Sequence, residues 1–362
     1  MNLPVGISTL QHSDRWIGGP ICFALTLLRR LLGQNSAPVR TIKRIGFIKL
    51  AEQGSTVLAY PAIRRAVKMV GRGNVYFVVF EDNRFILDVM EVVPPENVIT
   101  ISTRNLFAFT TGALRALMKT RRIKLDAVID LEFLSRSSAI ISYLSGASSR
   151  VGSHTFFGDG PYRGDLMTHR LLYNPHLHTS QTFQSMVEAL THDPAVLPTF
   201  AYVPPLEQES PSFNPAPEER AEIHSILKRE NAEIETAPLI LLNPNASDLL
   251  PLRRWPQDRF VTLAERLLQL FPDIFIAFTG APCEAEAAGK LVAQIASPRV
   301  LSLAGKTSLR QLLVLYHRAE ILITNDSGPA HFASMTPIHV VSLFGPETPK
   351  LFAPRSANTR AL

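Results

Sequence analysis

The residues best suited to chemistry lie near the C-terminal end of the chain, in the stretch "ILITNDSGPAHF" at 321–332. An apolar run with β-branched residues predicts a strand that ends at Asn325, and a proline shortly afterwards suits the first turn of a helix. Glycine lets a ligand approach the backbone closely, and the free N–H groups of an opening helix attract anions. The candidate anion-binding residues are Asp326, Ser327, Gly328, Pro329 and His331. The pattern predicts a phosphate or diphosphate site, although an ordinary capped helix would use the same residue types.

A second turn, "KLAEQGSTVLAYPAIRR" at 49–65, has the form of the first strand-turn-helix of a nucleotide-handling domain. Its helix is expected to open at Gly54, and the polar residues Glu52, Ser55 and Thr56 lie around that glycine. A serine cannot act as a general base near neutral pH without a partner of its own. The stretch therefore predicts a polar site in which Glu52 is the one carboxylate.

The elements that must position these turns alternate between short apolar runs and helical patterns from Thr41 onward. Such alternation predicts βαβ units and a parallel sheet. Five prolines between residues 203 and 217 interrupt it and indicate a linker, after which it restarts. We therefore predict an α/β protein with two doubly wound, Rossmann-like lobes that hold a ligand in a cleft at the carboxyl ends of their strands. The predicted parts are an N-terminal apolar helix with a linker (1–40), a first domain (41–202), the proline-rich linker (203–217) and a second domain (218–362).

The composition narrows the class of partner. A net charge of +6 favours nucleic acid, anionic lipid or a phosphorylated substrate. Nucleic acid is not predicted, because no zinc knuckle, helix-turn-helix signal or aromatic-basic platform is evident. The two cysteines, Cys22 and Cys283, are too far apart in sequence to suggest a disulfide framework or a metal knuckle, which fits a reducing compartment.

The N-terminal segment contains an uncharged, mainly apolar run that is followed by two arginines. The thirteen residues from Trp16 to Leu28 carry no charge, and Arg29 and Arg30 follow them. This run is too short to cross a bilayer, which takes about 20 apolar residues. Residues 16–32 could instead lie in the plane of a membrane surface, with the arginines at anionic headgroups. The alternative is an extra helix that packs on its own domain.

Several motifs together resemble glycosyltransferase family 9, the heptosyltransferases of lipopolysaccharide assembly. Within 321–349, the order asparagine-aspartate, serine, glycine, two residues, histidine and then phenylalanine-glycine-proline follows the family's signature. The stretch "LLNPNASDLLPLRRWPQDRF" is similar to another family motif, with Asn245 in place of the usual glycine and Arg254 where a lysine is common. "FTGAPCEAE", which contains Glu284, and "LAGKTSLRQL" also match. The resemblance covers about residues 41–355 and is weaker in the first lobe.

The resemblance implies a GT-B fold, with a nucleotide-sugar donor on the second lobe and an acceptor on the first. Its members transfer a sugar with inversion and without a divalent metal, and no other cofactor is expected. The turn at 327–331 and Arg254 would stabilise the departing diphosphate, Glu284 would hold the ribose hydroxyls, and Asn245 would lie in the same donor site. The implied partners are ADP-heptose and a lipid-linked glycan, at the cytoplasmic face of the inner membrane.

The first turn departs from the family pattern, which has an aspartate as general base where this chain has Ser55. Glu52 on the same turn could replace that base. Asp159 or Asp165, from the loop "FFGDGPYRGDLMTHR", could also do so, with Gly54 and Thr56 on the acceptor side. Two other functions remain open: a sugar-nucleotide-binding protein with little catalytic activity, and a nucleotide-sugar epimerase of the same fold.

Overall fold

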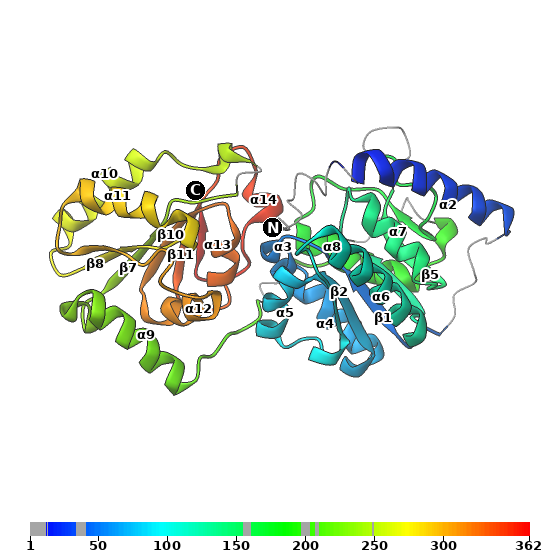
Figure 1. Cartoon of the computed structure of the whole chain (residues 1–362), viewed down its shortest axis with the longest axis horizontal. Coiled ribbons are helices and arrows are strands. Elements are labelled where there is room, and N and C mark those ends of the chain that lie inside the picture. Colours follow the sequence, from blue (N-terminus) through cyan, green and yellow to red (C-terminus); the bar gives the residue numbers. More distant parts are fainter. Residues whose placement is uncertain are drawn as a thin grey trace. The chain divides into compact units, whose positions relative to one another are not determined.

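The computed structural model describes residues 12, 14–33, 41–154, 161–196, 203–206, 210–247 and 250–362 (Figure 1). The chain divides into two compact units, Met1–Leu206 and Glu207–Leu362, which we call unit 1 and unit 2. Each contains one six-stranded sheet, and all of the strand pairs in the described residues are parallel. No described helix is long and apolar enough to cross a bilayer.

The sheet of unit 1 has the strand order β3-β2-β1-β4-β5-β6. Its strands are β1 (Ile45–Ile48), β2 (Val75–Phe80), β3 (Val98–Ile101), β4 (Ala127–Asp130), β5 (Ser149–Ser153) and β6 (His169–Leu171). Its helices are η1 (Asp14–Gly18), α2 (Gly19–Leu31), α3 (Gln53–Leu58), α4 (Tyr60–Val70), α5 (Arg84–Met90), α6 (Leu106–Ile123), α7 (Arg136–Leu144) and α8 (Thr179–Glu188). All four residues of β1 are buried, as expected for a central parallel strand covered on both faces.

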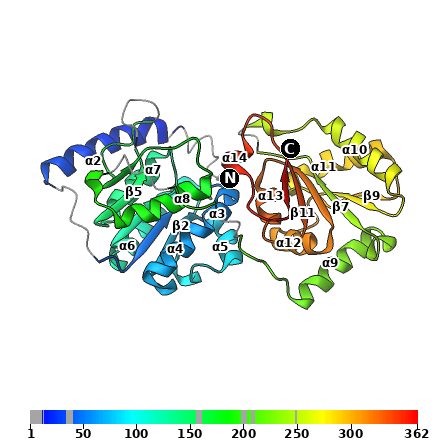
Figure 2. The same cartoon turned by 180° about the vertical axis from the view of Figure 1, so that it is seen from behind.

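Unit 2 repeats this plan with the strand order β12-β11-β10-β7-β8-β9. Its strands are β7 (Leu239–Asn243), β8 (Phe275–Phe278), β9 (Val300–Ser302), β10 (Ile321–Asn325), β11 (His339–Leu343) and β12 (Thr359–Ala361). Its helices are α9 (Pro217–Glu230), α10 (Gln257–Leu270), α11 (Ala285–Ile295), α12 (Leu309–Arg318), α13 (Gly328–Ala333) and α14 (Pro349–Phe352). Figure 2 shows the same elements from behind.

Alternate residues of the central strands pack on opposite faces of each sheet. In unit 1, Ile48 and Val78 pack against residues of α6, while Phe47 and Phe77 stack on each other with ring centroids 6.0 Å apart. In unit 2, Leu242 and Phe278 pack with residues of α10 and α11. In both sheets the strand order reverses in the middle, between β1 and β4 and between β7 and β10. The predicted α/β class with two doubly wound, Rossmann-like lobes is therefore confirmed.

Candidate functional site

Unit 2 brings polar groups together where its strand order reverses, the point at which doubly wound sheets bind ligands. Asn325, the last residue of β10, connects the two central strand ends. Its Nδ2 donates to the carbonyl of Pro244 at 2.9 Å, and its Oδ1 accepts from the backbone N–H of Trp255 at 3.0 Å. Asn325 therefore fixes the segments that follow β7 and β10 relative to one another.

Two predicted donor residues, Asn245 and Glu284, converge over Gly280, just beyond β8. A Cβ atom at Gly280 would lie 2.8 Å from both Asn245 Nδ2 and Glu284 Oε2. Asn245 Nδ2 donates to the carbonyl of Thr279 at 3.3 Å, and Glu284 Oε2 accepts from the N–H of Ala281 at 2.6 Å. The Glu284 carboxylate thus orders the turn before α11 through its Oε2.

Arg253, which was not among the residues predicted from the sequence, lies beside Asp326. Arg253 Nε is 3.4 Å from Asp326 Oδ2, and Arg253 Nη2 is 3.4 Å from Glu347 Oε1. Burial raises the pKa of Asp326, the charge of Arg253 opposes that rise, and Glu347 adds to it. The predicted Arg254 instead donates through its Nη2 to the carbonyl of Ala246 at 2.6 Å. Arg253 therefore contacts the predicted diphosphate turn directly, whereas Arg254 binds the segment that follows β7.

The other residues of that turn do not cap helix α13 with their side chains. Ser327 precedes α13, but its side chain makes no capping hydrogen bond; its Oγ donates to the carbonyl of Asn325 at 3.1 Å. Pro329 lies in the first turn of α13, which begins at Gly328 and has six residues. His331 is buried, with 7% of its surface exposed. The ordinary capped helix that was the alternative therefore does not explain Ser327.

In unit 1, the turn after β1 holds a cluster of three charges at the equivalent position in the sheet. Lys49 Nζ lies 3.1 Å from Glu52 Oε2 and 3.1 Å from Glu132 Oε2. The Lys49 side chain is 3% exposed, whereas that of Glu52 is 69% exposed. Burial lowers the pKa of Lys49, but the charges and hydrogen bonds of Glu132 and Glu52 outweigh it and raise that pKa overall. A buried cation therefore holds Glu52 in place while its carboxylate stays accessible.

Glu132 also shapes the backbone of this turn. Its Oε1 accepts from the N–H groups of Leu50 at 2.8 Å and of Ala51 at 3.1 Å. The next residue, Glu52, has a φ of +66°, a left-handed conformation that non-glycine residues seldom adopt. Strain of this kind persists only where surrounding contacts enforce it, and it clusters at functional sites. Sequence reasoning missed Glu132, because it follows β4, far along the chain from Glu52.

The remaining residues of the turn support Glu52. Ser55 Oγ donates to the Glu52 carbonyl at 3.0 Å and to its Oε2 at 3.2 Å. Gly54 lies within α3. Thr56 is fully buried, and its Oγ1 donates to the Glu52 carbonyl at 3.2 Å. The prediction that Thr56 faces the acceptor therefore needs correction, since a buried hydroxyl with a backbone partner stabilises the turn instead.

Asp159 and Asp165 were the alternative candidates for the general base. Asp159 lies outside the described residues. Asp165 Oδ2 is 3.1 Å from Arg29 Nη1 of α2, and its Oδ1 is 3.3 Å from Arg170 Nη1. Two arginines thus engage Asp165, and one of them belongs to the N-terminal helix. The role that the structure gives to Asp165 is to anchor α2.

Helix α2 has one face packed on unit 1 and one face open. The packed face contains Cys22, Thr26 and Arg29, and α2 contacts α7. Gly164 makes the packing possible, because a Cβ atom there would lie 2.5 Å from Thr26 Oγ1 and its φ is +69°. The exposed apolar residues of η1, α2 and its end are Trp16, Ile17, Ile21, Phe23, Leu27, Leu28, Leu31 and Leu32. The structure thus shows α2 packed on its own unit, and its position at a membrane surface stays a prediction.

No group of three or more His, Cys, Asp or Glu side chains in the described part of the chain is arranged to hold a metal ion.

Comparison with known proteins shows that this fold and these turns belong to enzymes that transfer sugars. Residues 114–362 match the family described as "Glycosyltransferase family 9 (heptosyltransferase)". The chain belongs to glycosyltransferase family 9, and it is a glycosyltransferase. The resemblance in its motifs is thereby confirmed.

Individual relatives agree with this assignment. The chain is 28% identical over 257 residues to a Haemophilus influenzae protein named lipooligosaccharide heptosyltransferase 2, an alignment that covers 69% of this chain and 68% of the relative. Among solved structures, an Escherichia coli ADP-heptose lipopolysaccharide heptosyltransferase II superposes with a TM-score of 0.69 at 19% identity, over 88% of this chain and 90% of the other. A family 9 glycosyl transferase from Veillonella parvula superposes with a TM-score of 0.70 at 22% identity, over 91% and 88%. These two structures show the GT-B fold alone.

Proposed function

We propose that the protein transfers a heptose from ADP-heptose to a hydroxyl group of a lipid-linked glycan of the lipopolysaccharide type, with inversion and without a metal ion. The names of its relatives support the donor and the acceptor class. The observation that carries the chemical proposal is the exposed carboxylate of Glu52, which Lys49 holds at the carboxyl end of β1. A family 9 chain that lacks an aspartate after its first glycine needs another base, and Glu52 lies on that same turn.

In the proposed reaction, Glu52 accepts the proton of the acceptor hydroxyl as its oxygen attacks the anomeric carbon of the donor. The new glycosidic bond forms while the bond from that carbon to the diphosphate oxygen breaks, and ADP leaves with the electron pair. Positioned carboxylates can take protons in this way, with effects of about 100- to 10,000-fold on rate. Lys49 and Ser55 act as positioning residues, since both contact the Glu52 carboxylate.

Unit 2 would bind the donor. Asn245 and Glu284, which lie side by side over Gly280, would contact the nucleoside. A hydrogen bond from a ribose hydroxyl to a carboxylate is strong because the carboxylate is charged. Arg253 and the N–H groups at the start of α13 would stabilise the negative charge that develops on the departing diphosphate. Arg254 lies one residue further and would assist from the same segment.

We further propose that the open face of α2 lies on the cytoplasmic surface of the inner membrane. Phe23 is 63% and Leu31 76% exposed on this face, and Arg15 and Arg30 are exposed nearby. An in-plane helix of this kind buries its apolar side chains and places arginines at anionic headgroups. Flotation with vesicles that contain anionic lipid should recover the wild-type protein but not the double variant Phe23→Ser/Leu31→Ser. A matched variant of exposed residues in unit 2, Leu270→Ser/Phe271→Ser, should float as the wild type does.

The transfer activity is tested by nucleotide release and by mass spectrometry of the product. ADP-heptose, UDP-glucose and GDP-mannose would each be incubated with membrane-extracted lipooligosaccharide and the protein. Heptose addition from ADP-heptose alone is the expected result. Nucleotide binding without transfer from any donor would instead support the sugar-nucleotide-binding function.

A further inference from the structure

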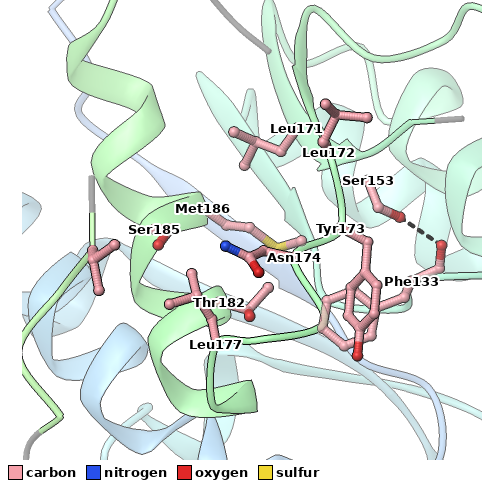
Figure 3. Close-up of a pocket in the computed structure, with 11 residues that line it drawn as sticks. Phe133, Ser153, Leu171, Leu172, Tyr173, Asn174, Leu177, Thr182, Ser185 and Met186 are labelled. Carbon is pink, nitrogen blue, oxygen red and sulfur yellow. Dashed lines mark hydrogen bonds between the residues drawn. The ribbon is translucent and has the colours of Figure 1, made fainter. Parts of the chain in front are cut away.

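A cavity in unit 1 has no role in the reaction described so far. Its volume is about 200 Å³, and it opens where β4, β5 and β6 end, beside α8 (Figure 3). Phe133, which directly follows Glu132, forms one wall, and Thr182 and Met186 of α8 form another. Helix α8 also contacts α3, the helix that opens after Glu52. The cavity therefore lies along the same edge of the sheet as the proposed base.

The lining of the cavity combines aromatic and apolar side chains with uncharged polar ones. The ring centroids of Phe133 and Tyr173 are 5.2 Å apart. Tyr173 is 43% exposed and Leu172 is 49% exposed. Exposed apolar side chains that gather at a concavity are typical of ligand sites. Ser153, Thr182 and the exposed Asn174 supply hydroxyl and amide groups. No charged side chain is among the described residues that line the cavity.

Asn174 is the best placed of the polar groups. Its Oδ1 accepts from the N–H of His176 at 2.9 Å, which fixes the amide and leaves its Nδ2 as a donor. In the view of Figure 3 the amide lies among the side chains of Met186, Thr182 and Leu177. A donor fixed in this way can distinguish a ligand that has a hydroxyl group from one that lacks it.

We propose that this cavity binds one uncharged sugar ring of the acceptor glycan, an inference that rests on the proposed glycosyl transfer. One face of a pyranose ring carries mainly C–H groups, which suit the electron-rich face of the exposed Tyr173 ring, while Phe133, which stacks on Phe183, supports Tyr173 from behind. The hydroxyls of the sugar would pair with Asn174 and Thr182. Ligand pockets for larger molecules measure roughly 300–1,000 Å³, so this cavity is sized for a single ring. An acidic sugar or a phosphate would lose hydration without gaining a charged partner, and an acyl chain would leave the polar groups unsatisfied.

Ligand-observed NMR tests the chemical class of the occupant directly. The probes are methyl mannoside, methyl glucuronide and octanol, each added to the full-length protein. Saturation transfer to methyl mannoside alone is expected with the wild type. The variants Tyr173→Leu and Asn174→Asp should weaken it at least fivefold; the aspartate keeps the acceptor for His176 but removes the donor. Tyr162→Leu, a variant of an exposed tyrosine elsewhere in unit 1, is the control and should bind as the wild type does.

Kinetics then distinguish this inference from the proposed function itself. With membrane-extracted acceptor, Tyr173→Leu and Asn174→Asp should each raise the KM for the acceptor about tenfold and leave the KM for the donor unchanged. If the wild type transfers no sugar, the proposed function fails, while the NMR result still reports on the cavity. If the wild type transfers sugar and both variants keep its acceptor KM, the inference about the cavity is overturned. Stronger saturation transfer to the glucuronide or to octanol would overturn it as well.

Discussion

The substitution Gly280→Ala would disturb the proposed donor site with little effect on the fold. Its new methyl group would lie 2.8 Å from Asn245 Nδ2 and from Glu284 Oε2, distances that are too short for a carbon atom. Both atoms are at the ends of flexible side chains, so they can move away, and the backbone of Gly280 can still accept from the N–H of Gly305 at 2.9 Å. The strain of such overpacking typically amounts to about 1–3 kcal/mol. If donor binding loses this free energy, the KM for the donor should rise about 5- to 140-fold, because 1.4 kcal/mol corresponds to a factor of ten.

Steady-state kinetics with varied donor and fixed acceptor measure this effect, and thermal unfolding measures the change in stability. The control is Gly289→Ala in α11, where a Cβ atom would meet nothing within 4 Å. Alanine is more favourable than glycine inside a helix by about 0.5–1 kcal/mol, so the control should be slightly more stable, with unchanged kinetics. If Gly280→Ala has the donor KM of the wild type, Asn245 and Glu284 do not bind the donor together.

Two further predictions concern buried titratable groups in unit 1. Lys49→Met would leave the largely buried Glu132 without its cation. We expect the free energy of unfolding, measured with urea, to fall by roughly 3 kcal/mol. A loss under 1 kcal/mol would show that the ion pair between Lys49 and Glu132 does not stabilise the fold. Burial, together with the charge of Arg150, lowers the pKa of His169 to about 4. The unfolded chain protonates this histidine near its ordinary pKa of about 6.5, whereas the folded protein does so only near pH 4. The free energy of unfolding is therefore undiminished above pH 6.5 and falls by about 3 kcal/mol as the pH drops from 6.5 to 4. His169→Gln should therefore lose less stability between pH 7 and pH 4.5 than the wild type, whereas the exposed His176→Gln should follow the wild type.

The sequence predicts the central strands well and the edge strands β6 and β12 poorly. Strands such as β1 and β7 are continuous apolar runs because helices cover both faces of the sheet, so composition alone reveals them. Strands β6 and β12 have three residues each, "HRL" and "TRA", and have no apolar run to detect. Their pairing depends on the neighbouring strand, which local sequence does not encode.

The candidate site shows the same division. Asn245, Glu284 and the residues after β10 belong to motifs with fixed spacing, so they could be proposed from the sequence. Pairs that are distant along the chain could not. Lys49 and Glu132 are 83 residues apart, and Arg253 meets Asp326 only because the loop after β7 folds toward the end of β10. Likewise, the burial of Thr56 becomes apparent only once α3 is placed against its neighbours.

In the proposed reaction, the role of Glu52 is that of the general base of a heptosyl transfer. This role is tested most directly by single-turnover transfer from ADP-heptose to membrane-extracted acceptor, with the wild type and Glu52→Gln compared at saturating donor. The glutamine keeps the size of the side chain and can still accept from Ser55 and Lys49, but it cannot take a proton at neutral pH. We expect the rate to fall by about 100-fold or more, as is typical for a lost general base, with donor affinity unchanged. Equal rates in the two proteins would show that another group accepts the proton.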